Sequence, residues 1–363
     1  MPFNGEYAEP LDDTNAPGGG GEVPELPRLG RVTIRQVAQL AGVSIATVSR
    51  VLNGRSDVSA ETRQIVERVA RAQGYARRAP SRPPERTGLV GITMPFAQPA
   101  YFATILAGAA EALYERDMRA VLCPTRHEHD REVSLLERLM HGETDGALLV
   151  LPEESSDELH QLAARDYRFV VIDPLHELEE NIPTISAANA SGANQATAHL
   201  IELGHRRIAV ITGRPDGLAS RRRLQGYHAA LAASGIMPDP RIEVAEDFVV
   251  AAGVAGAERL LGLPDPPTAI FCFNDSLAIG AMQAVRARGL RIPDDLSIVG
   301  FDDTPEAVVA FPALTTVRQP LAEVGRMAVS LLARLLSEHV VEPLHVELAT
   351  RLIVRSSSGP PPR

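Results

Sequence analysis

Residues 32–54 read VTIRQVAQLAGVSIATVSRVLNG, a pattern that predicts two short helices joined by a tight turn. Thr33 is a favourable N-cap residue, and Gln36 follows it at the spacing of a capping box. Gly42 lies between the two helical patterns and tolerates the positive φ that a sharp turn requires. The first helix is expected to bury one face, made of Ile34, Val37, Ala38 and Ala41. This arrangement is a helix-turn-helix, in which one helix fits the major groove of DNA.

The second helix is expected to begin at Ser44, whose hydroxyl caps it, and to stop at Asn53-Gly54. A third helix is expected from Ser59 to about Gln73. The side chains expected to face inward from these two helices are Val48, Val51, Leu52, Ile65, Val66 and Val69. Those expected to face outward from the second helix are Ile45, Ala46, Ser49 and Arg50. Three short helices around one small core make an all-α headpiece.

Periodicity alone does not decide between a DNA-binding module and three ordinary amphipathic helices. The charge of this region distinguishes the two. Residues 31–86 hold eleven arginines and four acidic residues, a net charge of +7, in a chain whose net charge is −10. A basic module on an acidic protein is typical of phosphate binding. The charge therefore favours DNA as the partner of this segment.

The segment resembles the headpiece of the LacI/GalR family of bacterial transcription repressors. The matching motifs are Thr33-Ile34 through Ala38, Ala41-Gly42-Val43-Ser44, Thr47-Val48-Ser49-Arg50-Val51-Leu52-Asn53, and Val58-Ser59 with Thr62-Arg63. The resemblance implies that Ile45, Ala46 and Arg50 read base edges. Arg50 would form a bidentate pair with guanine, and Ile45 and Ala46 would make apolar contacts. It implies phosphate contacts, which fix the register on DNA, at Thr33, Ser44, Thr47, Ser49, Asn53, Ser59 and Thr62. For each Ser or Thr, a helix cap or an exposed hydroxyl is the alternative.

The composition of the 363 residues indicates a globular protein of two or three domains, with no apolar run as long as a membrane span. Residues 1–30 carry six acidic residues and one arginine, which predicts a disordered acidic tail and not a signal peptide. Cys123 and Cys272 are far apart beside apolar residues, so we expect buried reduced thiols and a cytoplasmic location. His127 and His129 lie in a polar stretch without metal-ligand spacing, and no metal or cofactor is expected.

From Gly88 onward, short apolar strands alternate with helices, which predicts parallel sheets with helices on both faces. The expected strands are 89–92, 120–123, 146–150, 169–172, 208–211, 269–272 and 297–299. The expected helices are 102–116, 131–140, 194–203, 223–234, 254–261 and 277–288. Because the pattern repeats after about residue 190, we expect an α/β core of two doubly wound lobes with a ligand cleft between them.

This region also resembles the LacI/GalR family, whose core is similar to a periplasmic sugar-binding protein. The matching motifs are Leu203-Gly204-His205-Arg206-Arg207-Ile208, Asn274-Asp275 with Ala278-Ile279-Gly280-Ala281, Gly289-Leu290 with Ile292-Pro293-Asp294-Asp295, Val299-Gly300-Phe301-Asp302-Asp303, and Leu314-Thr315-Thr316-Val317-Arg318-Gln319-Pro320. The domains implied are a headpiece at 31–75, a hinge linker at 76–87, an N-lobe at 88–186 and 319–348, and a C-lobe at 187–318 and 349–358. Disordered tails are expected at 1–30 and 359–363.

The resemblance also implies where an effector binds. Arg223 matches an arginine that clamps the effector and Asp302 matches the aspartate opposite it, a pair suited to vicinal hydroxyls of a sugar. The further matches are an aromatic that packs on the ligand, two polar positions and an aromatic pair: Phe248, Asn274, Asp173, and Tyr101 with Phe102. The alternatives are turn capping for Asp302 and Asn274, core packing for Phe248 and a surface ion pair for Arg223. His205 is expected to be structural.

The hinge departs from the family pattern, in which Tyr-x-Pro-Asn, then Ala-Arg and a Leu, form a helix whose Leu enters the minor groove. Here Tyr75 is followed by residues 76–84, ARRAPSRPP, without the Pro-Asn pair or the Leu and with three prolines that oppose a helix. We expect Arg77, Arg78 and Arg82 to enter or flank a narrow minor groove instead, with weaker DNA bending. Residues 355–363, RSSSGPPPR, cannot form the Leu heptad tail of tetrameric members, so a dimer on a pseudo-palindromic site is expected.

The sequence therefore predicts a dimeric repressor of carbohydrate genes, whose affinity for operator DNA changes when a sugar-like effector shifts the lobes. A purine or nucleoside effector is the alternative within the family, because Tyr101-Phe102 also resembles its purine-binding branch. A solute-binding protein is the rival from another class, and the basic headpiece and missing leader oppose it. An enzyme is disfavoured because the chain contains no P-loop, dinucleotide fingerprint, nucleophile elbow or metal-ligand set.

Overall fold

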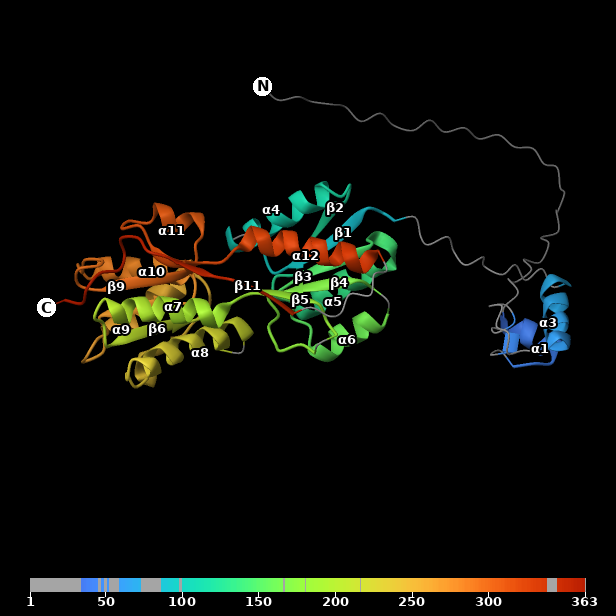
Figure 1. The fold of residues 1–363 in the computed structure, drawn as a ribbon, viewed down its shortest axis with the longest axis horizontal. Helices are drawn as coiled ribbons and strands as arrows, with labels where there is room; N and C mark the ends of the chain where they lie inside the picture. The colour runs from blue at the N-terminus through green and yellow to red at the C-terminus, as the bar shows by residue number, and fades with distance from the viewer. Residues whose placement is uncertain are drawn as a thin grey trace, which may run out of the picture. The chain divides into compact units, whose positions relative to one another are not determined.

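The computed structural model describes residues 34–44, 47–48, 51, 59–72, 86–97, 100–165, 167–179, 181–215, 217–337 and 345–362. The chain divides into two units, Met1–Pro84 and Glu85–Arg363 (Figure 1). The expected acidic tail at 1–30, and Arg77, Arg78 and Arg82 of the hinge, lie outside the described residues. None of the helices among the described residues has the length and apolar character needed to cross a membrane.

The first unit contains α1 (Ile34–Ala41) and α3 (Ala60–Ala72), and residues 47, 48 and 51 between them are also helical. Val37, Val48 and Val66 are fully buried and form the centre of its core. Gly42 has a φ of +64°, as the predicted turn requires, and the N–H of Val43 closes α1 on the carbonyl of Ala38 at 3.1 Å. The predicted turn after the first helix is confirmed.

The expectation that Ile65 faces inward is wrong. Its side chain is 39% exposed, whereas its neighbour Val66 is fully buried and Ala70, four residues further on, is also buried. Successive helical residues point about 100° apart, so a face centred on Val66 and Ala70 turns Ile65 toward solvent.

The second unit contains two six-stranded sheets, each the centre of one lobe (Figure 1). The first sheet has the order β11-β5-β4-β3-β1-β2 and is all parallel. Its strands are β1 (Leu89–Met94), β2 (Arg119–Pro124), β3 (Gly146–Val150), β4 (Phe169–Ile172), β5 (Thr184–Ala187) and β11 (His345–Leu348). Three of the expected strands, 89–92, 146–150 and 169–172, begin at the predicted residue.

The second sheet has the order β12-β10-β9-β8-β6-β7 and is parallel except where β12 pairs with β10. Its strands are β6 (Ile208–Thr212), β7 (Glu243–Ala245), β8 (Ala269–Cys272), β9 (Ser297–Asp302), β10 (Thr315–Arg318) and β12 (Arg351–Ile353). The chain crosses between the sheets after β5, after β10 and between β11 and β12.

Helices cover both faces of each sheet, because alternate residues of a strand point to opposite faces. In the first lobe, Leu148 and Val150 of β3 pack under α4 and α12, whereas Ala147 and Leu149 pack under α5 and α6. These helices are α4 (Ala100–Tyr114), α5 (His129–Arg138), α6 (Ser156–Ala164) and α12 (Leu321–Leu336), and a short π-helical turn, Leu139–Glu143, follows α5. In the second lobe the helices are α7 (Asn189–Glu202), α8 (Leu218–Ala233), α9 (Val250–Leu261), α10 (Asp275–Ala287) and α11 (Pro305–Val309), with a 3₁₀ turn at Pro240–Ile242.

The expectation of a disordered tail at 359–363 is wrong for its first residue. The N–H of Gly359 donates to Ser297 Oγ at 3.0 Å, and its carbonyl oxygen lies 2.9 Å from Nε2 of the buried His205. Two buried polar side chains thus bind the tail backbone, an anchor that the proline-rich composition does not reveal. His205 is structural, as expected, and Cys123 and Cys272 are both buried free thiols.

Candidate functional site

Two pairs of hydroxyls in the first unit make the same arrangement at two helix starts. Ser44 Oγ accepts the N–H of Thr47 at 3.0 Å, and Ser59 Oγ accepts the N–H of Thr62 at 3.2 Å. Within each pair the two hydroxyls also bond to each other, at 2.9 and 2.8 Å. A helix start presents free backbone N–H groups and a positive dipole end, so each pair stands where a phosphate binds favourably. In the structure, Ser44 and Ser59 cap the two helices, and Thr47 and Thr62 lie in the first turn of each helix as their partners.

Six other residues with an expected DNA contact lie outside the described part of the chain. They are Thr33, Ile45, Ala46, Ser49, Arg50 and Asn53.

Arg223 on α8 is the centre of the second lobe's half of the effector site. Its Nε donates to Asn189 Oδ1 at 2.7 Å, and its Nη1 donates to the carbonyl oxygen of Phe273. Its guanidinium carbon lies 3.8 Å from the ring centroid of Phe301, close enough for a cation–π interaction. The side chain is therefore buried and held from three sides, and the expectation of a surface ion pair does not describe it.

Asp302, the last residue of β9, lies beside this arginine. Its Oδ1 is 4.0 Å from Arg223 Nη2 and accepts Nε2–H of Gln319 at 2.6 Å. Its φ is +118°, a conformation that L residues rarely adopt. Strained backbone of this kind persists where the surrounding structure holds it, and it is found preferentially at binding sites.

The first lobe contributes the facing half. Tyr101, at the start of α4, donates its hydroxyl to Oδ2 of Asp173, which directly follows β4 and has a φ of +49°. Arg223 lies close enough to Asp173 and to the Tyr101 hydroxyl to interact electrostatically with both, and Asp302 lies close enough to Tyr101 to do the same. The two halves therefore face each other across the lobes, at the carboxyl ends of β4 and β9.

Burial governs the electrostatics of this site. It raises the pKa of Asp302 to about 8, with repulsion from Asp275 adding to the effect and the attraction of Arg223 opposing it. Burial also raises the pKa of Asp173 and lowers the pKa of Arg223. A ligand that donates hydrogen bonds to the two carboxylates would stabilise their charged forms.

Of the remaining residues predicted to bind the effector, Asn274 caps a helix, Phe248 lies over a strand end and Phe102 lies in the core. Asn274 caps α10 by accepting the N–H of Leu277 at 2.8 Å, and its amide lies 3.4 Å from the carbonyl of Phe248. The ring of Phe248 lies directly over Gly213, at the end of β6. Phe102 is buried in the core of the first lobe, with its ring edge-on to Tyr101 at 5.1 Å. The structure thus brings Tyr101, but not Phe102, to the site.

Three residues at the site were not predicted: Asn189, Gln319 and Phe301. Gln319 and Phe301 lie in motifs that carry the family resemblance, and their place in those motifs was the available sequence signal. Asn189 is separated from Arg223 by 34 residues and has no sequence signal that we can identify. Among the described residues, no group of three or more His, Cys, Asp or Glu is placed to hold a metal ion.

Comparison with known proteins identifies two kinds of domain in this chain. The model of bacterial regulatory proteins of the lacI family matches residues 33–78, and that of the periplasmic binding protein-like domain matches residues 197–358. The HTH-type transcriptional regulator CelR of Thermobifida fusca is 36% identical over 344 residues, covering 92% of this chain and 100% of that protein.

Solved structures give the same result. The CelR–cellobiose complex has a TM-score of 0.70 at 36% identity, covering 90% of this chain and 100% of that one. The lac repressor dimer bound to operator and the anti-inducer ONPF has a TM-score of 0.69 at 28% identity, covering 90% of this chain and 99% of that one. The chain belongs to the LacI family of bacterial transcriptional regulators.

Proposed function

We propose that this protein is a transcriptional repressor of carbohydrate uptake or catabolism genes, and that a sugar-like effector bound between its lobes controls its affinity for operator DNA. Its relatives are regulators and not enzymes. The relative with 36% identity has been solved with cellobiose, and another at 36% identity is a ribose operon repressor. A neutral polyhydroxylated ligand is therefore the first class to test.

The observation that carries this proposal is the buried set of Arg223 and Asp302 from one lobe and Tyr101 and Asp173 from the other. A planar guanidinium and a carboxylate offer donors and acceptors at the spacing of vicinal hydroxyls. Phe248 adds an aromatic face beside Gly213, against which a sugar ring can pack. Because the two halves belong to different lobes, a ligand that bonds to both would stabilise the closed arrangement of the lobes.

The proposed domains follow the sheets: an N-lobe at 88–186 and 319–348 and a C-lobe at 187–318 and 349–358. The headpiece is proposed to bind DNA through Arg50 with Ile45 and Ala46, and through the hydroxyl positions named above. Arg77, Arg78 and Arg82 are proposed to lie at the minor groove. The location proposed is the cytoplasm, where operator DNA is found.

A homodimer is proposed as the DNA-binding form. The second lobe exposes Val309 and Phe311 almost fully, at 81% and 82%, next to Val308 at 58%. Adjacent large apolar side chains that are this exposed favour a protein contact. A two-fold dimer would present two headpieces to two half-sites of a pseudo-palindrome.

The test is selection of genomic DNA fragments by the purified protein at physiological salt, followed by sequencing. Enrichment of one pseudo-palindromic site is expected, and fluorescence anisotropy on that site then reports the response to cellobiose, ribose and a panel of nucleosides. Release or tightening by a sugar supports the proposal, and the Asp302→Asn variant should lose that response. A response to nucleosides alone would establish the alternative effector class, and binding without sequence preference would contradict the regulator proposed here.

A further inference from the structure

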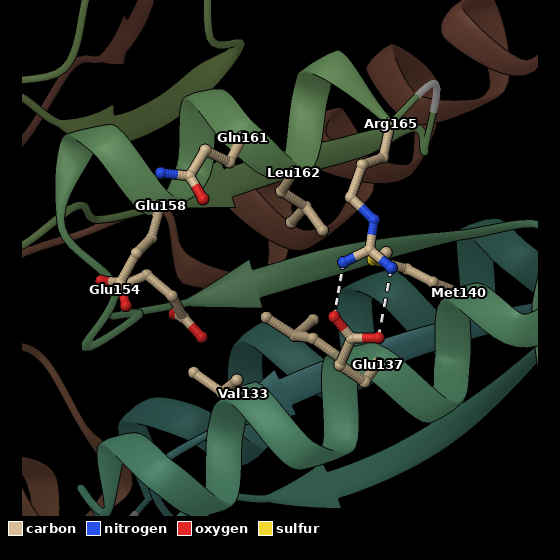
Figure 2. Close-up of a pocket in the computed structure, with 9 residues that line it drawn as sticks. Val133, Glu137, Met140, Glu154, Glu158, Gln161, Leu162 and Arg165 are labelled. Atoms are coloured by element: carbon tan, nitrogen blue, oxygen red, sulfur yellow. Dashed lines mark hydrogen bonds and ion pairs between the residues drawn. The ribbon is translucent and has the colours of Figure 1, made fainter.

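A groove separate from the interlobe site runs between α5 and α6 on one face of the first lobe (Figure 2). It has a volume of about 190 Å³, smaller than a drug-sized site of about 300–1,000 Å³ and suited only to a short ligand. Its apolar lining comes from both helices and from the π-helical turn after α5: Val133, Leu136, Met140 and Leu162. None of Tyr101, Asp173, Arg223 and Asp302 lines it.

One end of the groove holds two neighbouring buried carboxyl groups, those of Glu154 and Glu132. Glu154, in the segment between β3 and α6, is 5% exposed, and within the described part of the chain neither of its carboxylate oxygens accepts a hydrogen bond. Glu132 of α5 is fully buried nearby: its Oε2 accepts the N–H of Glu153 at 2.9 Å, and its Oε1 has no partner among the described residues. Two neighbouring buried acids without a cation are costly, because burial disfavours both charges and the two charges repel.

The basic side chains around the groove already have partners. Arg165, which lines the far end, forms a two-pronged pair with both carboxylate oxygens of Glu137, as Figure 2 shows. His129 Nε2 lies 3.0 Å from Glu158 Oε1. Burial, followed by repulsion from Glu132, raises the pKa of Glu154 to about 8. The groove therefore combines an apolar floor with an acceptor at one end that the neighbouring cations do not serve.

We propose that the α5–α6 groove binds a small amphipathic organic cation, with an ammonium head on Glu154 and an alkyl body on Leu136, Leu162 and Met140. An ammonium supplies three N–H donors and one positive charge, which matches an acid with two free oxygens. A short alkyl chain covers the apolar side chains of the two helices and gains about 25 cal/mol for each Å² removed from water.

The test is isothermal titration of the full-length protein with hexylamine. Three probes of similar length isolate the requirements: 1-hexanol lacks the charge, hexanoate reverses it, and hexyltrimethylammonium keeps the charge without N–H donors. One molecule of hexylamine is expected to bind per chain, at least ten-fold more tightly than any of the three. Absence of hexylamine binding, or equal binding of 1-hexanol, would overturn the proposal.

Variants locate the site. At pH 9, above the pKa of about 8 of Glu154, Glu154→Gln keeps the shape and removes the charge, so hexylamine affinity should fall at least ten-fold. Glu115→Gln, at an exposed acid directly after α4 and outside the groove, should leave affinity unchanged. Val133→Trp, at the partly exposed rim, should fill the groove and abolish binding without disturbing the sheet. Affinity that survives Glu154→Gln, or that is lost in Asp302→Asn instead, would show that the amine binds elsewhere.

Discussion

Arg223 holds the interlobe site together through contacts that only a guanidinium makes. It donates in two directions within one plane, to Asn189 and to the carbonyl of Phe273, while its flat face lies on Phe301. A lysine ammonium has one charge but neither the plane nor the fork. The identity of this residue, and not only its charge, therefore determines the shape of the site.

We expect Arg223→Lys to reduce effector affinity at least ten-fold and to lower the unfolding temperature. Arg223→Ala should cost about 1–3 kcal/mol of stability, because it leaves Asn189 Oδ1 and the carbonyl of Phe273 without their donor. Thermal unfolding and titration with the effector measure both effects. Arg241→Lys, at an exposed ion pair, is the matched control and should change neither quantity. Equal effector binding by wild type and Arg223→Lys would contradict the role given to the guanidinium.

Asp302 makes stability depend on pH with a definite sign. Its pKa rises from 3.8 in the unfolded chain to about 8 in the folded protein, so the folded state holds its proton more tightly. This contribution is fully present below about pH 4 and is lost as pH rises through 8, at about 1.4 kcal/mol per pKa unit. Asp302→Asn, which does not titrate, should show a smaller loss of stability between pH 5 and 8 than wild type. Parallel curves for the two proteins in chemical denaturation would contradict the raised pKa.

At the scale of elements, the strands were predicted better than the contacts between them. Leu148, Leu149 and Val150 form a short apolar run that only a doubly covered strand explains, and β3 has the predicted ends. By contrast, β7, β11 and β12 are short and partly exposed, so their local sequence lacks the apolar pattern. These strands form because longer neighbours pair with them, and such pairing depends on the chain crossings rather than on local residues.

The same limit applies to the site. Arg223 and Asp302 were predicted because they match an arginine and an aspartate of the family, whereas Asn189 supports Arg223 from the start of a different helix. Phe102 was predicted to bind the effector because, together with Tyr101, it matches an aromatic pair of the family. Neighbours on a helix diverge by about 100°, so when Tyr101 turns to Asp173, Phe102 turns into the core. Motifs thus identify residues, but helical geometry and long-range packing decide which of them meet.

The end of β6 offers a test of how elements position the effector face. A Cβ on Gly213 would lie 1.7 Å from the ring of Phe248, so Gly213→Ala must displace that ring. We expect a loss of about 1–3 kcal/mol in stability and a clear loss of effector affinity. Gly217→Ala is the control, because its Cβ would meet nothing closer than 3.5 Å. Unchanged effector affinity in Gly213→Ala would show that the Phe248 ring does not pack on the ligand.

At the scale of the whole core, the two lobes contact each other not only where the chain crosses between them but also through side chains and loops. Arg222 of α8 pairs with Glu177 of the β4–β5 loop at 2.8 Å, and the N–H of Leu218 donates to the carbonyl of Leu175 at 2.9 Å. Arg214 and Glu153 approach to 3.9 Å. Because these contacts join opposite lobes, they stabilise the closed arrangement and must break when the lobes separate.

Charge reversal at this pair should therefore shift the balance between closed and open lobes. Arg222→Glu places two acids opposite each other, and we expect effector affinity to fall up to about five-fold, since exposed pairs contribute about 0.2–1 kcal/mol. The double variant Glu177→Arg with Arg222→Glu restores an attractive pair and should recover most of the loss. Both effects should shrink in high salt, which screens exposed charges. If the double variant binds no better than the single one at low salt, the pair does not act through lobe closure, and the effector must hold the lobes together by its own contacts alone.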